Sequence, residues 1–290
     1  MLERYSRSRL ALAVAACALT ASIASGQNGP TPSNGCGSLP GYTQLKAALT
    51  AATIAENSGL KNQMWGTIVD RDGVVCAVAF TGNDRTAQWP GSRVISAQKA
   101  NTANAFSLDS GSFSNGKGQA AGLALSTANL YSAVQPGGSL FGLQESNPVN
   151  PSVAYAGSPD RNGTAIDPMV GFKIGGVNVF GGGLTLYGQG QVVVGAIGVS
   201  GDTSCTDHMV AWRTRNNLNL DHLAGVGGVS GDSARPDNII YDVTANPNGG
   251  TGISKGGFGH PTCINGGSDK TSGGQAVKLP LEPAGKPRDG

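Results

Sequence analysis

The sequence predicts an α+β fold in which helices cover a single antiparallel sheet. Three observations support this prediction: apolar residues recur at helical spacing in several segments, an Asp-Gly pair separates two β-rich runs, and glycines separate three later apolar runs. The predicted elements follow the order helix, two strands, helices, three strands, helix. This order favours an antiparallel sheet over a doubly wound parallel one.

The first half of the chain contains the helices and the hairpin. A helix is expected within residues 41–60, where apolar side chains keep a helical period. Two β-rich runs within residues 64–80 flank Asp72 and Gly73, a strong hairpin-turn pair. A second helix is expected over residues 92–106 with Ser92 as its N-cap, and a short third helix over 125–134.

The strongest strand pattern lies in the glycine-rich stretch of residues 175–201. Its apolar runs, at 177–180, 184–187 and 192–199, are separated by Gly-rich turns. This pattern predicts an antiparallel meander of three strands. A final helix is expected from about Ser204 to Asn217.

Composition favours an exported, loop-rich protein. Only 13% of the 290 residues are charged, 46 are glycine, and the net charge is +2, which argues against nucleic acid or an anionic membrane surface as a partner.

Basic residues precede an apolar stretch at residues 10–24, followed by small residues, so residues 1–26 are interpreted as a signal peptide. Cys17 within a loose lipobox offers the alternative of a lipid anchor.

The rest of the chain divides by composition. Residues 27–40 are interpreted as a linker, 41–224 as the main domain, and 225–290 as a Gly- and Pro-rich C-terminal extension whose end is expected to be poorly ordered. Two polar insertions, residues 109–120 and 146–168, interrupt the domain.

Four cysteines remain after removal of the signal peptide, and an even number in an exported chain suggests two disulfides. Three connectivities are possible. We favour Cys36 with Cys76 and Cys205 with Cys263, because each bond would then tie an extension to the domain. The wide spacings and the lack of any C-x-x-C motif argue against a zinc site.

Standard catalytic motifs are missing from the sequence. The glycines of "GAIGVSG" (residues 195–201) lack dinucleotide-loop spacing, and Ser200 lacks the final glycine of a nucleophile elbow, although His222 and His260 lie downstream. No H-E-x-x-H or C-x-x-C-H occurs. Arg213 and Arg215 in the last predicted helix are expected to form a solvated face.

Asp207 and His208, at the start of the last helix, could form a site, because imidazole is a common ligand of haem iron. The alternative is structural: Asp207 would complement the helix dipole, and His208 would be a polar residue of the first turn. Lys99 is an unusual charge in a helix of small residues, and it either extends to the surface or faces a pocket.

Three segments together resemble the GlcG/HbpS family of haem-binding proteins: "TIVDRDGVVCAVAF", "SAQKANTANAF" and "GGVNVFGGG…VVVGAIGVSGDTSCTDHMVAW". The resemblance covers residues 42–220. Lys99 and Thr102 match the family's KA-x-TA helix, and Asp207 matches an acidic position after its Gly-rich loop. Asn178 replaces a proline of the family pattern.

The resemblance implies a five-stranded antiparallel sheet with a profilin-like layout, homo-oligomers, and haem or a similar tetrapyrrole as the ligand. It also implies a link to redox sensing beside a membrane sensor in one branch. We therefore predict an exported haem-binding protein with Lys99, Thr102, Asp207 and His208 as site residues and His208 as the metal ligand. The alternatives are a small-molecule enzyme, which the lack of a positioned acid–base pair argues against, and a partner-binding module without a ligand.

Overall fold

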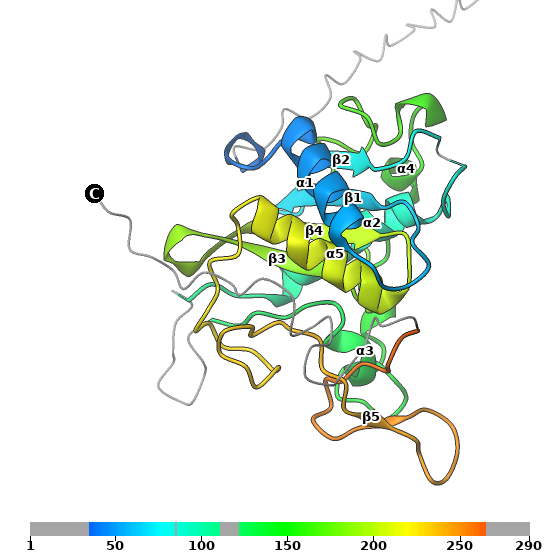
Figure 1. Ribbon diagram of the computed structural model, residues 1–290, viewed down its shortest axis with the longest axis vertical. Helices are drawn as coiled ribbons and strands as arrows, with labels where there is room; N and C mark the ends of the chain where they lie inside the picture. Colours follow the sequence, from blue (N-terminus) through cyan, green and yellow to red (C-terminus); the bar gives the residue numbers. More distant parts are fainter. Residues whose placement is uncertain (1–34, 85, 111–121, 265–290) are drawn as a thin grey trace, which may run out of the picture. The chain divides into compact units, whose positions relative to one another are not determined.

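A computed structural model describes residues 35–84, 86–110 and 122–264 of the chain (Figure 1). The chain divides into two units, Met1–Pro30 and Thr31–Gly290, and the description below concerns the second. The predicted signal peptide with Cys17, most of the linker, most of the 109–120 insertion and the end of the extension lie outside the described residues.

The central sheet is antiparallel and has four strands, not the five expected. Its strands are β1 (Trp65–Asp70), β2 (Val75–Phe80), β3 (Gly183–Gly188) and β4 (Val192–Ser200), in the order β2-β1-β4-β3. The hairpin of β1 and β2 turns at the expected Asp-Gly pair, where Gly73 has a φ of +79°. The expected strand at residues 177–180 does not form.

The segment at residues 177–182 does not form a strand, because side chains of neighbouring elements bond to several of its backbone groups. The amide of Asn178 donates to Thr102 Oγ1 over 2.9 Å, and the amide of Gly181 donates to Ser204 Oγ over 2.6 Å. The carbonyl of Phe180 accepts from Thr127 Oγ1 over 2.8 Å. These bonds replace strand pairing for residues 178–181, and the segment meets the sheet at Gly182, whose carbonyl accepts from the Val199 amide of β4 over 2.8 Å.

Helices cover both faces of the sheet. On one face α2 (Ser92–Phe106) buries Val94, Ala97 and Ala100 against side chains of β1, β2 and β4. On the other face α1 (Tyr42–Ala55) and α5 (Ser204–Asn217) lie next to each other (Figure 1) and bury a cluster that includes Leu45, Ile197 and Trp212. The predicted α+β class is therefore confirmed.

Gly198 lets α2 lie directly on β4. A Cβ atom at this position would come within 1.8 Å of the Ser96 carbonyl oxygen and 2.5 Å of the Ala100 amide nitrogen. Any side chain here would force the helix away from the sheet. Gly198 of the "GAIGVSG" run thus serves close packing of a helix on a strand, whereas a Cβ atom on Gly195 would meet the Val69 carbonyl of β1.

The remaining elements of the described chain are short. These are α3 (Leu130–Ala133), α4 (Pro151–Ala154), the 3-10 turns Cys36–Ser38, Leu143–Glu145, Pro159–Arg161 and Gln189–Gln191, and a small sheet of β5 (Val243–Thr244) and β6 (Ile253–Ser254). The second insertion is tied to α2 by buried Arg93, which donates to both carboxylate oxygens of Asp167. Within the described ranges, no helix combines the length and apolar character needed to cross a membrane.

Two disulfides crosslink the described chain, and they join the same cysteines that the sequence analysis favoured. Cys36, before α1, is bonded to Cys76 on β2, and Cys205, in the first turn of α5, is bonded to Cys263 in the extension. Each disulfide fastens a segment outside the helix–sheet core to that core.

Candidate functional site

Lys99 of α2 and Asp207 of α5 meet in the interior, at the end of β4. Lys99 Nζ lies 2.7 Å from Asp207 Oδ2 and donates over 3.1 Å to the carbonyl of Val199. The Phe180 ring centroid lies 4.8 Å from the same nitrogen. The predicted site residues Lys99 and Asp207 are thus brought together from opposite faces of the sheet.

Burial opposes both charges of this pair. Desolvation lowers the pKa of Lys99, although attraction to Asp207 counteracts the shift. Desolvation also raises the pKa of Asp207 to about 7, against the opposing effect of Lys99 and of a hydrogen bond from the Asp202 amide. Each partner therefore depends on the other to remain charged in the interior.

His208 follows Asp207 and is completely buried. Neither ring nitrogen has a hydrogen-bond partner among the described residues, and the ring packs against Trp212 with 5.8 Å between centroids. Burial lowers the pKa of His208 to about 3, although Asp237 acts in the opposite direction. At neutral pH this imidazole is uncharged, so one ring nitrogen carries a free lone pair.

Thr102, the fourth predicted site residue, contacts the Gly-rich segment. Its hydroxyl donates to the Gln98 carbonyl over 2.8 Å and accepts from the Asn178 amide over 2.9 Å. A proline at position 178 would have no N–H to donate. Asn178, the departure from the family pattern, therefore supplies a hydrogen bond that proline could not make.

The Gly-rich segment closes over the Lys99–Asp207 pair. A Cβ atom on Gly182 would lie 2.2 Å from the Val199 carbonyl oxygen, 3.0 Å from Asp207 Cβ and 3.1 Å from Lys99 Nζ. Gly182 also has a φ of +115°, a conformation that side chains disfavour. Glycine is needed here for both reasons.

The C-terminal extension covers the other side of the site. Buried Arg215 of α5 donates to both carboxylate oxygens of Asp237, over 2.6 and 3.0 Å. The expectation that Arg215 lies on a solvated face was wrong, because the extension supplies a carboxylate that the helix pattern does not reveal. Arg213 is partly exposed and pairs with Glu56.

Ser204 and His260 form a contact that sequence reasoning missed. His260 Nε2 lies 2.7 Å from Ser204 Oγ, and His260 Nδ1 lies 2.6 Å from the Pro261 carbonyl oxygen. His260 is 3% exposed, and burial lowers its pKa to about 4. The two residues are 56 positions apart, so only the path of the extension could have revealed the pair.

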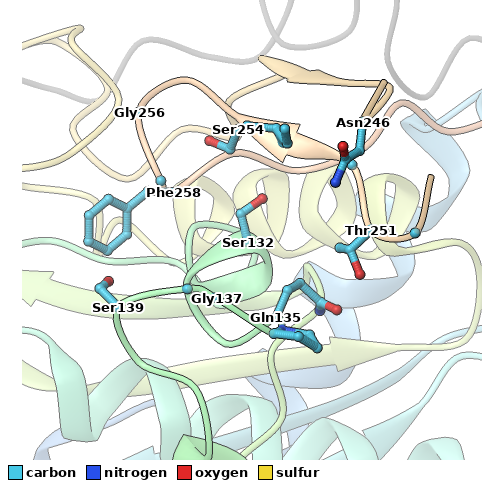
Figure 2. A pocket seen from close by; sticks show the side chains of 15 residues that line it. Ser132, Gln135, Gly137, Ser139, Asn246, Thr251, Ser254, Gly256 and Phe258 are labelled. Atoms are coloured by element: carbon cyan, nitrogen blue, oxygen red, sulfur yellow. The ribbon is translucent and has the colours of Figure 1, made fainter. Parts of the chain in front are cut away.

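A separate pocket of about 700 Å³ lies between residues 132–139 and the β5–β6 region (Figure 2). Hydroxyl and amide side chains, including Gln135, Asn246 and Thr251, line it together with several glycines and the ring of Phe258. Its lining contains no histidine, cysteine, tyrosine or methionine and none of the four predicted site residues. It therefore offers haem iron no side-chain ligand of the usual types.

The residues around His208 fit haem in donor chemistry but not in access. A neutral, unpartnered imidazole is suited to bind iron. However, His208 is 0% exposed, with Gly181 against its Cβ and Asp237 and His260 of the extension close enough for their charges to act on it, so a planar macrocycle cannot reach it in this arrangement.

Fold and site together define a class of protein: an α+β domain with one antiparallel sheet between helices and a buried lysine–aspartate–histidine cluster at the start of α5. A family model described as "Haem degrading protein HbpS-like" matches residues 43–215, more than half of the chain. The chain belongs to this HbpS-like family, which confirms the resemblance found in the sequence.

Solved structures of low sequence identity were also found. Protein ORFY of Klebsiella pneumoniae is 24% identical with a TM-score of 0.38, over 61% of this chain and 86% of that one. The PduOC:heme complex is 21% identical with a TM-score of 0.39, over 61% and 91%. A double mutant of Streptomyces reticuli HbpS is 16% identical with a TM-score of 0.33, over 73% and 99%. No curated protein matches the chain significantly.

Proposed function

We propose that this chain is an exported protein that binds haem or a related planar tetrapyrrole, with His208 as the metal ligand. The observation that carries the proposal is the buried, neutral imidazole of His208, whose ring nitrogens have no partner among the described residues. An unsatisfied buried polar group costs free energy, so a ligand that uses its lone pair would compensate for that cost. The chain also belongs to a family described as haem-degrading, which supports haem as the ligand.

Lys99, Asp207 and Thr102 would fix the positions of the residues around the ligand. Lys99 supplies a cation, and Asp207 fixes its position over 2.7 Å. Thr102 anchors the Gly-rich segment through the Asn178 amide. When bound, haem would contribute an iron centre capable of redox chemistry.

Because His208 is fully buried and residues of the extension act on it, we propose that the extension moves for the ligand to enter. Asp237 and His260 are the residues of the extension whose charges act on His208. This requirement predicts slow association with haem and a rate that increases when the extension is loosened.

Export is proposed from the predicted signal peptide and from the two disulfides, which persist in oxidising compartments. With it we propose the division into linker, domain at 41–224 and extension at 225–290.

A homo-oligomer is supported by exposed apolar side chains such as Phe141, Tyr155 and Ile166, which are 64% to 70% exposed. A role in haem handling or in redox sensing with a membrane sensor would use such a surface.

A second candidate function is hydrolysis of a small molecule by Ser204 and His260. The 2.7 Å contact between hydroxyl and imidazole, with Pro261 orienting the ring, is the arrangement of an activated nucleophile. However, burial lowers the pKa of His260 to about 4, which makes the imidazole a weak base at neutral pH. Haem binding is therefore the function that the site supports best.

Haem titration followed at the Soret band tests the proposal. We expect saturable binding at micromolar haem by the purified protein, and loss or a marked shift of the Soret band in the His208→Ala variant. The matched control is His222→Ala, a second buried histidine whose Nε2 already contacts Gln189 and the Asn219 carbonyl. An unchanged spectrum in His208→Ala would remove this residue as the ligand, and no saturable binding at all would overturn the proposed function.

A further inference from the structure

The extension brings a group of metal-ligating side chains to the start of α5. Cys205 lies in the first turn of the helix, and His260 and Cys263 lie three positions apart in the extension. The ligand atoms of all three residues lie within 4.8 Å of one another, and Cys205 Sγ is 3.9 Å from His260 Nδ1. Cys205 is 0% exposed and His260 is 3% exposed, whereas Cys263 is partly exposed and leaves a route to the cluster from solvent.

We propose that this cluster is a redox-controlled metal site: when the Cys205–Cys263 disulfide is reduced, Cys205, Cys263 and His260 bind one Zn²⁺ ion. The proposal concerns residues outside the predicted haem site and does not depend on haem binding. It also goes against the expectation from sequence, where the wide cysteine spacing argued against zinc.

The chemistry balances with a dithiol as the reductant. The dithiol loses two electrons and two protons and becomes a disulfide, and the Cys205–Cys263 bond breaks to give two thiols. Binding of Zn²⁺ then releases both thiol protons, so that two thiolates and a neutral imidazole hold the ion. The position of Cys205 in the first turn of a 14-residue helix favours its thiolate.

The backbone spacing suits the metal as well as the disulfide. With Zn–S bonds of about 2.3 Å and tetrahedral angles, the two sulfur atoms must lie about 3.8 Å apart. The Cα atoms of Cys205 and Cys263 are 6.1 Å apart. This separation allows the sulfur atoms to move apart by side-chain rotation, without unfolding of the extension.

His260 has a hydrogen-bond partner on each ring nitrogen, and one of these partners must be given up for the ring to bind zinc. In the oxidised form its Nδ1 donates to the Pro261 carbonyl, and its Nε2 accepts from Ser204 Oγ. In the metal-bound form Nδ1 would give up its bond to the Pro261 carbonyl, the ring proton would lie on Nε2 and be donated to Ser204 Oγ, and the Nδ1 lone pair would bind zinc. Gly181 fixes this hydroxyl through its amide, at 2.6 Å. A hydrogen bond to the other ring nitrogen is the usual support for a zinc-bound imidazole.

The other disulfide provides a natural control. Cys36, Cys76 and Asp70 also cluster, but no imidazole is part of this group. Asp70 Oδ1 already accepts from the amides of Asp72 and Val74, over 3.0 and 2.9 Å. We therefore assign the metal to the Cys205 cluster, where zinc would replace the disulfide as the crosslink between α5 and the extension.

The test is a Zn²⁺ titration of the purified protein, oxidised and then reduced without oxygen, in competition with a chromophoric chelator. We expect one equivalent of zinc bound by the reduced form and none by the oxidised form. The Cys36→Ser/Cys76→Ser variant should keep that equivalent, and Cys205→Ser/Cys263→Ser should lose it. His260→Gln, which keeps both thiols, should bind zinc at least tenfold more weakly.

Co²⁺ in place of Zn²⁺ gives a second readout, a thiolate-to-cobalt absorption band that should require Cys205 and Cys263. If the reduced chain loses its native circular dichroism, zinc should restore the spectrum in the wild type and not in His260→Gln. The proposal is overturned if the reduced protein binds no zinc, or if zinc fails to restore a native circular dichroism spectrum that reduction has abolished. It is also overturned if zinc binding is lost in Cys36→Ser/Cys76→Ser and kept in Cys205→Ser/Cys263→Ser. Haem binding is measured separately at the Soret band, so the two proposals can fail independently.

Discussion

Lys99 and Asp207 lie 2.7 Å apart with side chains 0% and 1% exposed, and they connect the helices on opposite faces of the sheet. A pair this deep is sensitive to loss of either partner, because the remaining charge has neither solvent nor counter-ion. The contribution of the pair to the free energy of unfolding is therefore best measured by removing one partner and then both.

We expect Lys99→Met alone to lower the free energy of unfolding by about 3–5 kcal/mol, since it leaves Asp207 buried without its cation. The double variant Lys99→Met/Asp207→Leu should recover most of this loss. Urea denaturation of the wild type, both single variants and the double variant measures the coupling. Strictly additive losses would contradict the structure of the pair.

Acid should destabilise the protein through its buried histidines. Burial lowers the pKa of His260 to about 4 and that of His208 to about 3, from an ordinary value of 6.5. Between the folded and unfolded values the unfolded chain binds more protons, so this stability is fully present above pH 6.5 and decreases as the pH falls towards 4. The expected slope is roughly 1.4 kcal/mol per pH unit for each histidine.

The variant His260→Gln tests this origin of acid sensitivity. It removes one of the two buried histidines, so the slope of unfolding free energy against pH between 6.5 and 4 should fall by roughly 1.4 kcal/mol per pH unit. The variant His208→Gln should lower the slope by a similar amount, and the double variant should leave the opposite slope of Asp207, whose pKa burial raises to about 7. A slope unchanged in all three variants would assign acid sensitivity to other groups.

Close contact between α2 and β4 predicts a severe effect of Gly198→Ala. The added Cβ would lie 1.8 Å from the Ser96 carbonyl, and neither the helix nor the strand can move without disturbing the core. We expect a loss of more than about 2 kcal/mol, as for overpacked cores. Gly37→Ala is the control, since a Cβ there meets no atom within 4 Å. Equal thermal stability of the two variants would refute the packing role of Gly198.

Loss of the Cys205–Cys263 bond should release the extension. The Cys205→Ser/Cys263→Ser variant should lose about 2–4 kcal/mol of stability. It should also be cleaved faster by trypsin at Lys255, which is exposed in the extension. The Cys36→Ser/Cys76→Ser variant should leave the cleavage rate at Lys255 unchanged, because that bond lies outside the extension. Equal rates in both variants would indicate that the disulfide does not hold the extension in place.

The fold was predictable where the signal is local. Helical spacing and the Asp-Gly turn predicted α1, α2, α5 and the hairpin of β1 and β2. The run at 177–180 looked like a strand because it is apolar and bounded by glycines. Its backbone bonds go instead to side chains of Thr102, Thr127 and Ser204, and no pattern within the run reveals such distant partners.

The site was predictable only in part. Lys99 and Asp207 were singled out from their residue types and positions and then matched to the family pattern, and their direct contact spans 108 positions. The burial of Arg215 and the position of His260 depend on Asp237 and Ser204, partners that only the folded extension brings close. Sequence periodicity reports which face of a helix is apolar, but not which loop later covers it.

The covalent connectivity has a consequence for how the chain is made. The two disulfide loops, residues 36–76 and 205–263, share no residue, so each bond joins cysteines that follow one another along the chain. Among these four cysteines, a chain delivered N-terminus first presents Cys36 and Cys76 as a complete pair before Cys205 emerges. An oxidant that simply links thiols in order of arrival would therefore produce the native pattern, with no reshuffling by an isomerase.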